Sequence, residues 1–103
     1  MNSTRTDPVA PAGSTTLSLP YQYTAGFVSV IATRSSDAAI NTRSMYVVSR
    51  IYGGNSQVSL ISSQSEGVGV AFTVTITSLG GVVVTNNGGV DAQIFIAYSG
   101  IGN

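Results

Sequence analysis

The residues of this chain that could perform acid–base chemistry are few. The acids are Asp7, Asp37, Glu66 and Asp91, and histidine, lysine and cysteine are absent. A serine nucleophile therefore has neither a histidine nor a lysine to take its proton. A pair of carboxylates could hydrolyse a glycoside, but Asp37 and Glu66 fall in predicted loops and Asp91 lies beside a predicted turn. We expect a protein that is not an enzyme.

The sequence also offers few residues that could bind a metal ion or a phosphate group. Calcium could use Asp37, Asn41 or Glu66 together with backbone carbonyls, but their spacing matches no known calcium loop. The glycine-rich stretches Gly67-Val68-Gly69 and Gly80-Gly81 precede no predicted helix whose N-terminus would face an anion. We therefore predict no metal and no cofactor.

Tyrosines provide the remaining recognition chemistry, because a flat ring with a hydroxyl suits both sugars and subunit contacts. The chain has five of them and three phenylalanines. Tyr46 and Tyr98 are expected to be core or interface rings with paired hydroxyls. The glycine-containing turn that begins at Tyr52 is a candidate ligand or glycan contact. Its candidate residues are Tyr52, Asn55, Ser56 and Gln57.

The elements that must position these residues are predicted to be strands. In residues 71–79, Phe72, Val74 and Ile76 alternate with threonines, which is the period of a strand with one buried face. We expect the other apolar runs to pair with this strand. In residues 27–33 both faces are apolar, which is typical of a strand that is covered on each side.

Further strands are predicted at 15–19, 43–51, 57–62, 82–85 and 90–99, with polar loops at 34–42 and 63–69. About seven strands separated by glycine turns, without a credible helix, predict an all-β fold, an antiparallel β-sandwich or jelly roll. We expect residues 14–103 to form a single domain of this kind.

Residues 1–13 are predicted to form an extended N-terminal arm, because the prolines oppose regular pairing and no periodicity is present. The arm is either a frayed terminus or a segment laid along a neighbouring subunit. It lacks the pattern of a signal peptide, and no stretch is apolar enough to insert in a membrane. The candidate assembly residues of this arm are Arg5, Asp7, Pro8, Val9 and Pro11.

The charge content is unusual. Only 8% of the residues are charged and the net charge is zero, whereas ordinary soluble domains carry roughly 25%. Without clustered cations, nucleic acid is not expected as a partner. Such a surface gives little protection against association, so we expect much of it to be covered by copies of the same chain or by other subunits.

The sequence from residue 26 onward resembles the small β-domains of tailed-phage virion proteins, such as the terminal knobs of tail fibres and tailspikes. The resemblance lies in GFVSVIATRSS, RSMYVVSRIYGGNSQVSLISSQSEG and AFTVTITSLGGVVVTNNGGVDAQIFIAYSG, with a hairpin that carries YVVSRIYGG. It implies a homotrimeric β-sandwich that forms or caps a fibre or spike among other virion proteins, and that in some cases touches host surface glycans.

Phage capsid decoration proteins are the alternative that the resemblance leaves open. They are small, cysteine-free and usually trimeric, and an extended N-terminal arm grips the shell. The proline-bearing residues 1–13 favour decoration, whereas the pattern of short strands rich in valine and serine favours the fibre tip. Either role implies a virion location after assembly in the host cytoplasm.

Overall fold

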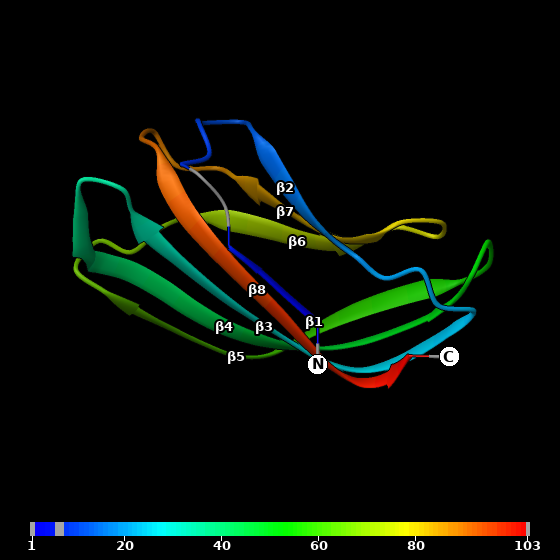
Figure 1. The fold of residues 1–103 in the computed structure, drawn as a ribbon. Coiled ribbons are helices and arrows are strands. Elements are labelled where there is room, and N and C mark those ends of the chain that lie inside the picture. The colour runs from blue at the N-terminus through cyan, green and yellow to red at the C-terminus, as the bar shows by residue number, and fades with distance from the viewer. Residues whose placement is uncertain (1, 6–7, 103) are drawn as a thin grey trace.

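A computed structural model describes residues 2–5 and 8–102, and the side chains of residues 8–102. The described residues contain eight strands, all paired antiparallel, in two sheets and no helix. The larger sheet has the order β1 (Asn2–Arg5), β8 (Ala92–Gly102), β3 (Tyr23–Arg34), β4 (Asp37–Ile51) and β5 (Ser56–Glu66). The smaller has the order β2 (Ser14–Ser18), β7 (Gly81–Asn86) and β6 (Phe72–Ile76). The three-stranded sheet lies over one face of the longer, curved sheet (Figure 1). The predicted all-β sandwich is confirmed.

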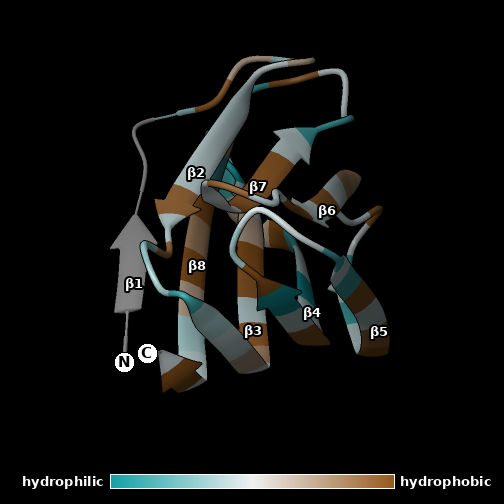
Figure 2. Ribbon diagram, turned by 90° about the vertical axis from the view of Figure 1, so that its right-hand side faces the viewer, coloured by the Kyte–Doolittle hydropathy of each residue, from teal (hydrophilic) through white to brown (hydrophobic). Residues whose placement is uncertain are grey.

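The core lies between the two sheets and is built mostly by the central strands β3 and β8. Val28 and Val30 of β3 and Ile94 and Ile96 of β8 are fully buried, because alternate side chains of a strand point to the same face. Figure 2 shows the apolar and polar segments alternating along these strands. The remaining buried apolar residues are Val9, Leu17, Leu19, Ala32, Val48, Ile76, Val82, Val84, Ala92 and Tyr98.

Tyr98 is a core ring with a paired hydroxyl, as predicted. Its hydroxyl donates to the backbone carbonyls of Ala25, at 3.2 Å, and of Ile101. Tyr46 is half-buried and packs against the core. Burial raises the pKa of both tyrosines, because the phenolate is less well solvated than the phenol. Both hydroxyls therefore stay protonated through neutral pH.

Strand β6 has the predicted alternation but not the predicted central position. Ile76 is buried and Phe72 and Val74 are half-buried, while the threonines between them are exposed. Within the described residues, however, β6 pairs with β7 alone, at the edge of the smaller sheet. It ends at Ile76 because the hydroxyl of Thr77 accepts from the backbone N–H of Gly80, at 2.9 Å, and turns the chain.

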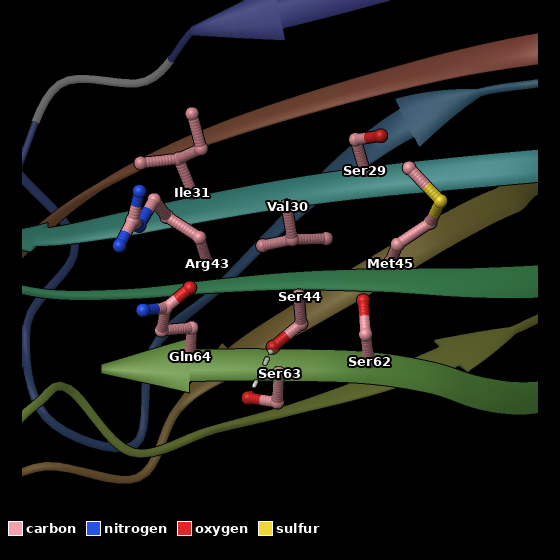
Figure 3. A pocket seen from close by; sticks show the side chains of 9 residues that line it. All are labelled: Ser29, Val30, Ile31, Arg43, Ser44, Met45, Ser62, Ser63 and Gln64. Atoms are coloured by element: carbon pink, nitrogen blue, oxygen red, sulfur yellow. Dashed lines mark hydrogen bonds between the residues drawn. The ribbon is translucent and has the colours of Figure 1, made fainter.

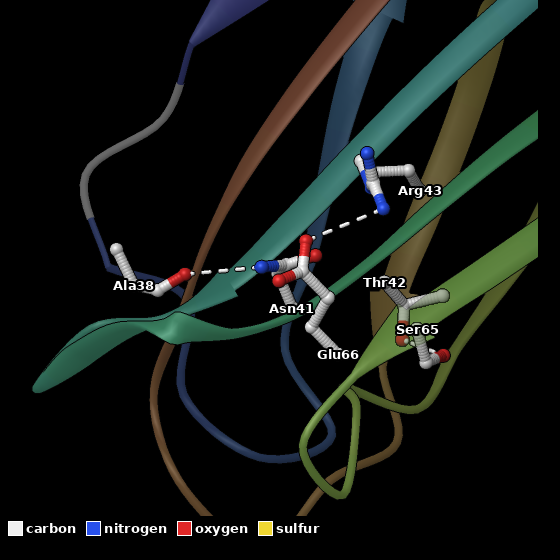
Figure 4. Close-up of polar contacts among 6 residues, drawn as sticks. All are labelled: Ala38, Asn41, Thr42, Arg43, Ser65 and Glu66. Atoms are coloured by element: carbon white, nitrogen blue, oxygen red, sulfur yellow. Dashed lines mark hydrogen bonds and ion pairs between the residues drawn. The ribbon is translucent and has the colours of Figure 1, made fainter.

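The loops predicted at 34–42 and 63–69 were largely wrong, because β4 begins at Asp37 and β5 continues to Glu66. The polar residues in these stretches pair with each other across the two strands. The hydroxyl oxygens of Thr42 and Ser65 lie 2.7 Å apart (Figure 4). Hydroxyl pairs of this kind stabilise neighbouring strands without burying an apolar side chain.

The part of the predicted arm that the structure describes lies against its own chain. Residues Asn2–Arg5 pair with β8, and Val9 is buried and exchanges backbone hydrogen bonds of 2.7 and 3.0 Å with Ala92. The buried side-chain amide of Asn86 adds a bond of 2.8 Å to the carbonyl of Val9. Pro8 and Pro11 are exposed. Asp7 and the side chain of Arg5 lie outside the described residues, and contact of the arm with a neighbour stays a prediction.

One buried arginine connects the two sheets at the end where β4 turns into β5. Arg50 is 2% exposed, and its guanidinium donates to four backbone carbonyls. Two belong to the turn between β6 and β7, with bonds of 3.2 Å to Thr77 and 2.9 Å to Gly80. The others belong to Leu19 and Tyr21, between β2 and β3. No described carboxylate forms an ion pair with it. Its charge is stabilised by the carbonyl dipoles and by the nearby ring of Tyr52, while its Nε is buried without a partner.

Candidate functional site

The predicted ligand turn lies at the same end of the sandwich as Arg50, but its residues do not converge. The Tyr52 ring is 42% exposed, and the Arg50 guanidinium lies 5.5 Å from its centroid. Ser56 pairs with Arg50 and donates to the carbonyl of Ile76 at 3.3 Å, so it faces the small sheet.

The other two turn residues are directed elsewhere. Gln57 is the next residue of β5 and therefore faces away from the small sheet, where it donates to the hydroxyl of Ser59 at 3.4 Å. Asn55 accepts from the backbone N–H of Ile51 at 3.1 Å and lines a hollow on the large sheet. A glycan contact at this turn stays a prediction.

The acids singled out in the sequence lie apart. Asp37 accepts from the backbone N–H of Ala39 at 3.0 Å, and Asp91 is exposed in the loop between β7 and β8. Glu66 forms an ion pair of 3.3 Å with Arg43. Among the described residues, no three side chains of the kinds that bind metals lie together, and none of the secondary structure is a helix that could cross a membrane.

The most extensive unusual surface is the side of the large sheet that faces away from the small one, which we call the outer face. It consists of the outward residues of β8, β3, β4 and β5, in the ranges 93–101, 23–33, 41–51 and 57–66. Sequence reasoning found both apolar sides of residues 27–33 but not the rest of this surface. Its large apolar side chains are 41–58% exposed and comprise Tyr23, Phe27, Ile31, Met45, Val47, Ile51 and Ile101.

Strand register places these side chains in adjacent rows. Phe27 is directly opposite Val47 and Tyr23 is opposite Ile51, so the rows continue from β3 to β4. Two hollows lie between the rows, of about 350 and 340 Å³. Figure 3 shows the first, with Ile31 and Met45 on one side and the serines of β5 on the other.

The outer face is almost free of charge. Among its described side chains the charged ones are Arg43 and Glu66, and they form the ion pair already noted. Serine, threonine and amide side chains occupy most of the remaining positions, such as Ser29, Ser49 and Gln57. A neutral surface that mixes half-exposed apolar rows with hydroxyls has no electrostatic bias toward a charged partner, and its patch is larger than scattered surface residues produce.

No protein-family model and no curated protein matches this sequence. The fold is similar to part of a solved structure, the crystal structure of the Acinetobacter phage vB_ApiP_P1 tailspike protein, with a TM-score of 0.66 and 19% sequence identity. The match covers 96% of this chain and 21% of that one. At this identity the likeness establishes the fold alone, and the present chain corresponds to about a fifth of the tailspike chain.

Proposed function

We propose that this chain is a non-enzymatic structural β-domain of a phage virion. In this proposal it forms a homotrimer that builds or caps a tail fibre or spike, and the outer face of each copy is turned toward the other two. The observation that carries the proposal is the neutral, apolar outer face on a fold that is similar to part of a tailspike. The trimeric state is the one implied by the virion β-domains that the sequence resembles.

The dimensions of the outer face suit contact between copies. Strands about 4.8 Å apart and about 35 Å long give four strands a surface of roughly 700 Å². A standard protein interface buries about 800 Å² on each partner. In the trimer each outer face is shared between two contacts, and the three faces together bury roughly 2,100 Å², against about 1,600 Å² for both partners of a standard interface.

The energy of covering this surface is also of the right order. Covering a half-exposed Val, Ile or Phe side chain contributes about 1 kcal/mol, half of the value for complete burial. Seven such side chains lie on each copy, so a trimer that buries all three outer faces gains about 21 kcal/mol. Assembly of three copies takes two association steps, each of which costs roughly 4–15 kcal/mol, and the gain exceeds the lower part of this cost.

Capsid decoration through residues 1–13 is the alternative role. Two observations favour the fibre or spike role instead. Residues 2–5 are paired with β8 of the same chain, and Val9 is buried in the same core. An arm that is held within its own domain has less chain free to grip a shell.

The mass of the purified protein in solution tests the proposal. At micromolar concentrations we expect light scattering to give three times the 10.5 kDa mass of the chain. The trimer should persist in high salt, because its contact is apolar and not ionic. A single species of 10.5 kDa over the same concentrations would rule out the assembly and, with it, this function.

A further inference from the structure

Two arginines face the space between the sheets, one at each end of the sandwich. Arg50 lies on the inward side of β4 beside Val48, and Arg34 lies on the inward side of β3, where it pairs with the buried Ala92 of β8. The surroundings of the two side chains differ. Arg50 has four carbonyl acceptors, as described above.

The guanidinium of Arg34 has no such acceptors. No hydrogen bond or ion pair joins its side chain to another described residue, and its Nε is buried without a partner, as is the Nε of Arg50. The difference between the two lies in the Nη atoms, which have carbonyl acceptors in Arg50 and none in Arg34. A guanidinium carries five N–H donors in a planar fork and is rarely left without acceptors when it is partly buried. This side chain is therefore equipped for an acceptor that the described chain does not supply.

A cavity lies beside Arg34. It has a volume of about 230 Å³ and is lined by Arg34 and by the two loops that close this end of the sandwich, at residues 68–71 and 88–91. Drug-sized ligands occupy about 300–1,000 Å³, so this cavity suits a small molecule or one unit of a longer one. A Cβ added at Gly89 would meet no atom within 4 Å, so the wall is open there.

We propose that this cavity binds the carboxylate group of a small hydroxylated ligand, with Arg34 as its donor. A carboxylate matches the guanidinium fork with two parallel hydrogen bonds. Asp91 also lines the cavity, and its carboxylate is exposed. A negative group at this position disfavours a dianion such as phosphate and can accept hydrogen bonds from ligand hydroxyls. A singly charged hydroxy acid satisfies both residues.

The cavity lies at the end of the sandwich that is closed by residues 68–71 and 88–91, away from the outer face. This proposal can therefore hold or fail whether or not the chain forms a trimer. NMR titration of the whole protein with glucuronate tests it, with glucose as the neutral analogue of the same ring. We expect saturable shifts at the Arg34 Nε–H and the Gly88 and Gly89 amides, and a dissociation constant at least tenfold lower for glucuronate than for glucose.

Three substitutions separate the site from a general charge effect. Arg34→Met should weaken glucuronate binding at least tenfold, while Arg34→Lys, which keeps the charge but not the fork, should weaken it severalfold. Thr75→Asp, which changes the net charge by the same amount at an exposed position of β6, should leave binding unchanged within twofold. Asp91→Asn removes the negative group of the cavity and leaves Arg34 in place, so inorganic phosphate should bind severalfold more tightly relative to glucuronate, which keeps the test valid if Arg34→Met unfolds.

Several outcomes would overturn the proposal. They are the absence of saturable shifts at tens of millimolar glucuronate, equal binding of glucose, or an unchanged preference between phosphate and glucuronate in folded Asp91→Asn. Tighter binding of inorganic phosphate than of glucuronate would overturn the assignment of a singly charged ligand. Acetate that binds as tightly as glucuronate would remove the role of the hydroxyls and of Asp91.

Discussion

Phe27→Lys is expected to convert the assembly into folded monomers. Phe27 is 52% exposed at the centre of the outer face, opposite Val47, so a lysine there projects outward without entering the core. In the trimer, however, its ammonium would be placed in an apolar contact whose charged residues, Arg43 and Glu66, are already paired. An uncompensated charge in a contact costs about 3–5 kcal/mol, which corresponds to a dissociation constant at least about 100-fold higher.

Thr75→Lys is the matched control for this substitution. Thr75 is exposed on the outward side of β6, on the opposite side of the sandwich from Phe27. It introduces the same charge on a strand that takes no part in the proposed contact, so the trimer should remain. Light scattering and thermal melting of both variants measure assembly and folding separately. If Phe27→Lys stays trimeric, the outer face is not the contact surface. The chain would then still form a trimer, but through another surface.

Arg50→Met is expected to cause the largest loss of stability of any single substitution considered for this chain. Two effects oppose each other. Removal of the guanidinium leaves four carbonyls without their donor, at about 1–3 kcal/mol for each that remains buried. It also removes a buried charge that has no carboxylate partner, which is a gain.

We expect the lost hydrogen bonds to outweigh this gain, because they connect both sheets through residues far apart in the chain, such as Leu19 and Gly80. The expected net loss is about 3 kcal/mol, which corresponds to a fall in Tm of about 12–24 °C for a domain of this size. Thr75→Met is the control, since this exposed position of β6 lies outside the proposed contact and should change the free energy of unfolding by less than about 0.5 kcal/mol. A loss below about 1 kcal/mol for Arg50→Met would mean that desolvation of the guanidinium cancels its hydrogen bonds.

Local alternation was enough to predict much of this fold. It placed Phe72, Val74 and Ile76 on one face of their strand, which is the face that the structure buries or half-buries. The alternation of side chains with a period of two belongs to each strand by itself. It is therefore the same whichever strands become its neighbours. The sandwich class and the approximate places of β2 to β8 followed from the same signal and from the glycine turns, whereas β1 lies within the predicted arm.

The pairing of strands could not be predicted in this way. The stretches 34–42 and 63–69 have the composition of loops, but most of their residues pair as strands, with cross-strand hydroxyl pairs such as Thr42 and Ser65, 2.7 Å apart. The central position of β3 and β8 depends on which long strands meet, a tertiary property that the pattern of β6 does not contain. In residues 1–13, Val9 is buried against a strand more than eighty residues later, and no local signal reports this contact.

The sites were predictable to a smaller extent. Two apolar sides in residues 27–33 correctly indicated that Phe27 and Ile31 would lie on a second apolar surface. Which residues of β4 and β8 lie beside them can be known only from the register of the paired strands. The cavity beside Arg34 forms from three segments that are distant in sequence, so only the fold brings them together.

Protection of a single thiol tests the central claim most directly. The chain has no cysteine, so Val47→Cys places one reporter thiol on the outer face and Thr75→Cys places one on the opposite side of the sandwich. We predict that a thiol reagent labels Cys at position 47 at least tenfold more slowly than at position 75 under assembly conditions. The difference should disappear when Phe27→Lys is added. Equal labelling of the two positions in the native protein would show that the outer face is open to solvent, and would contradict the account.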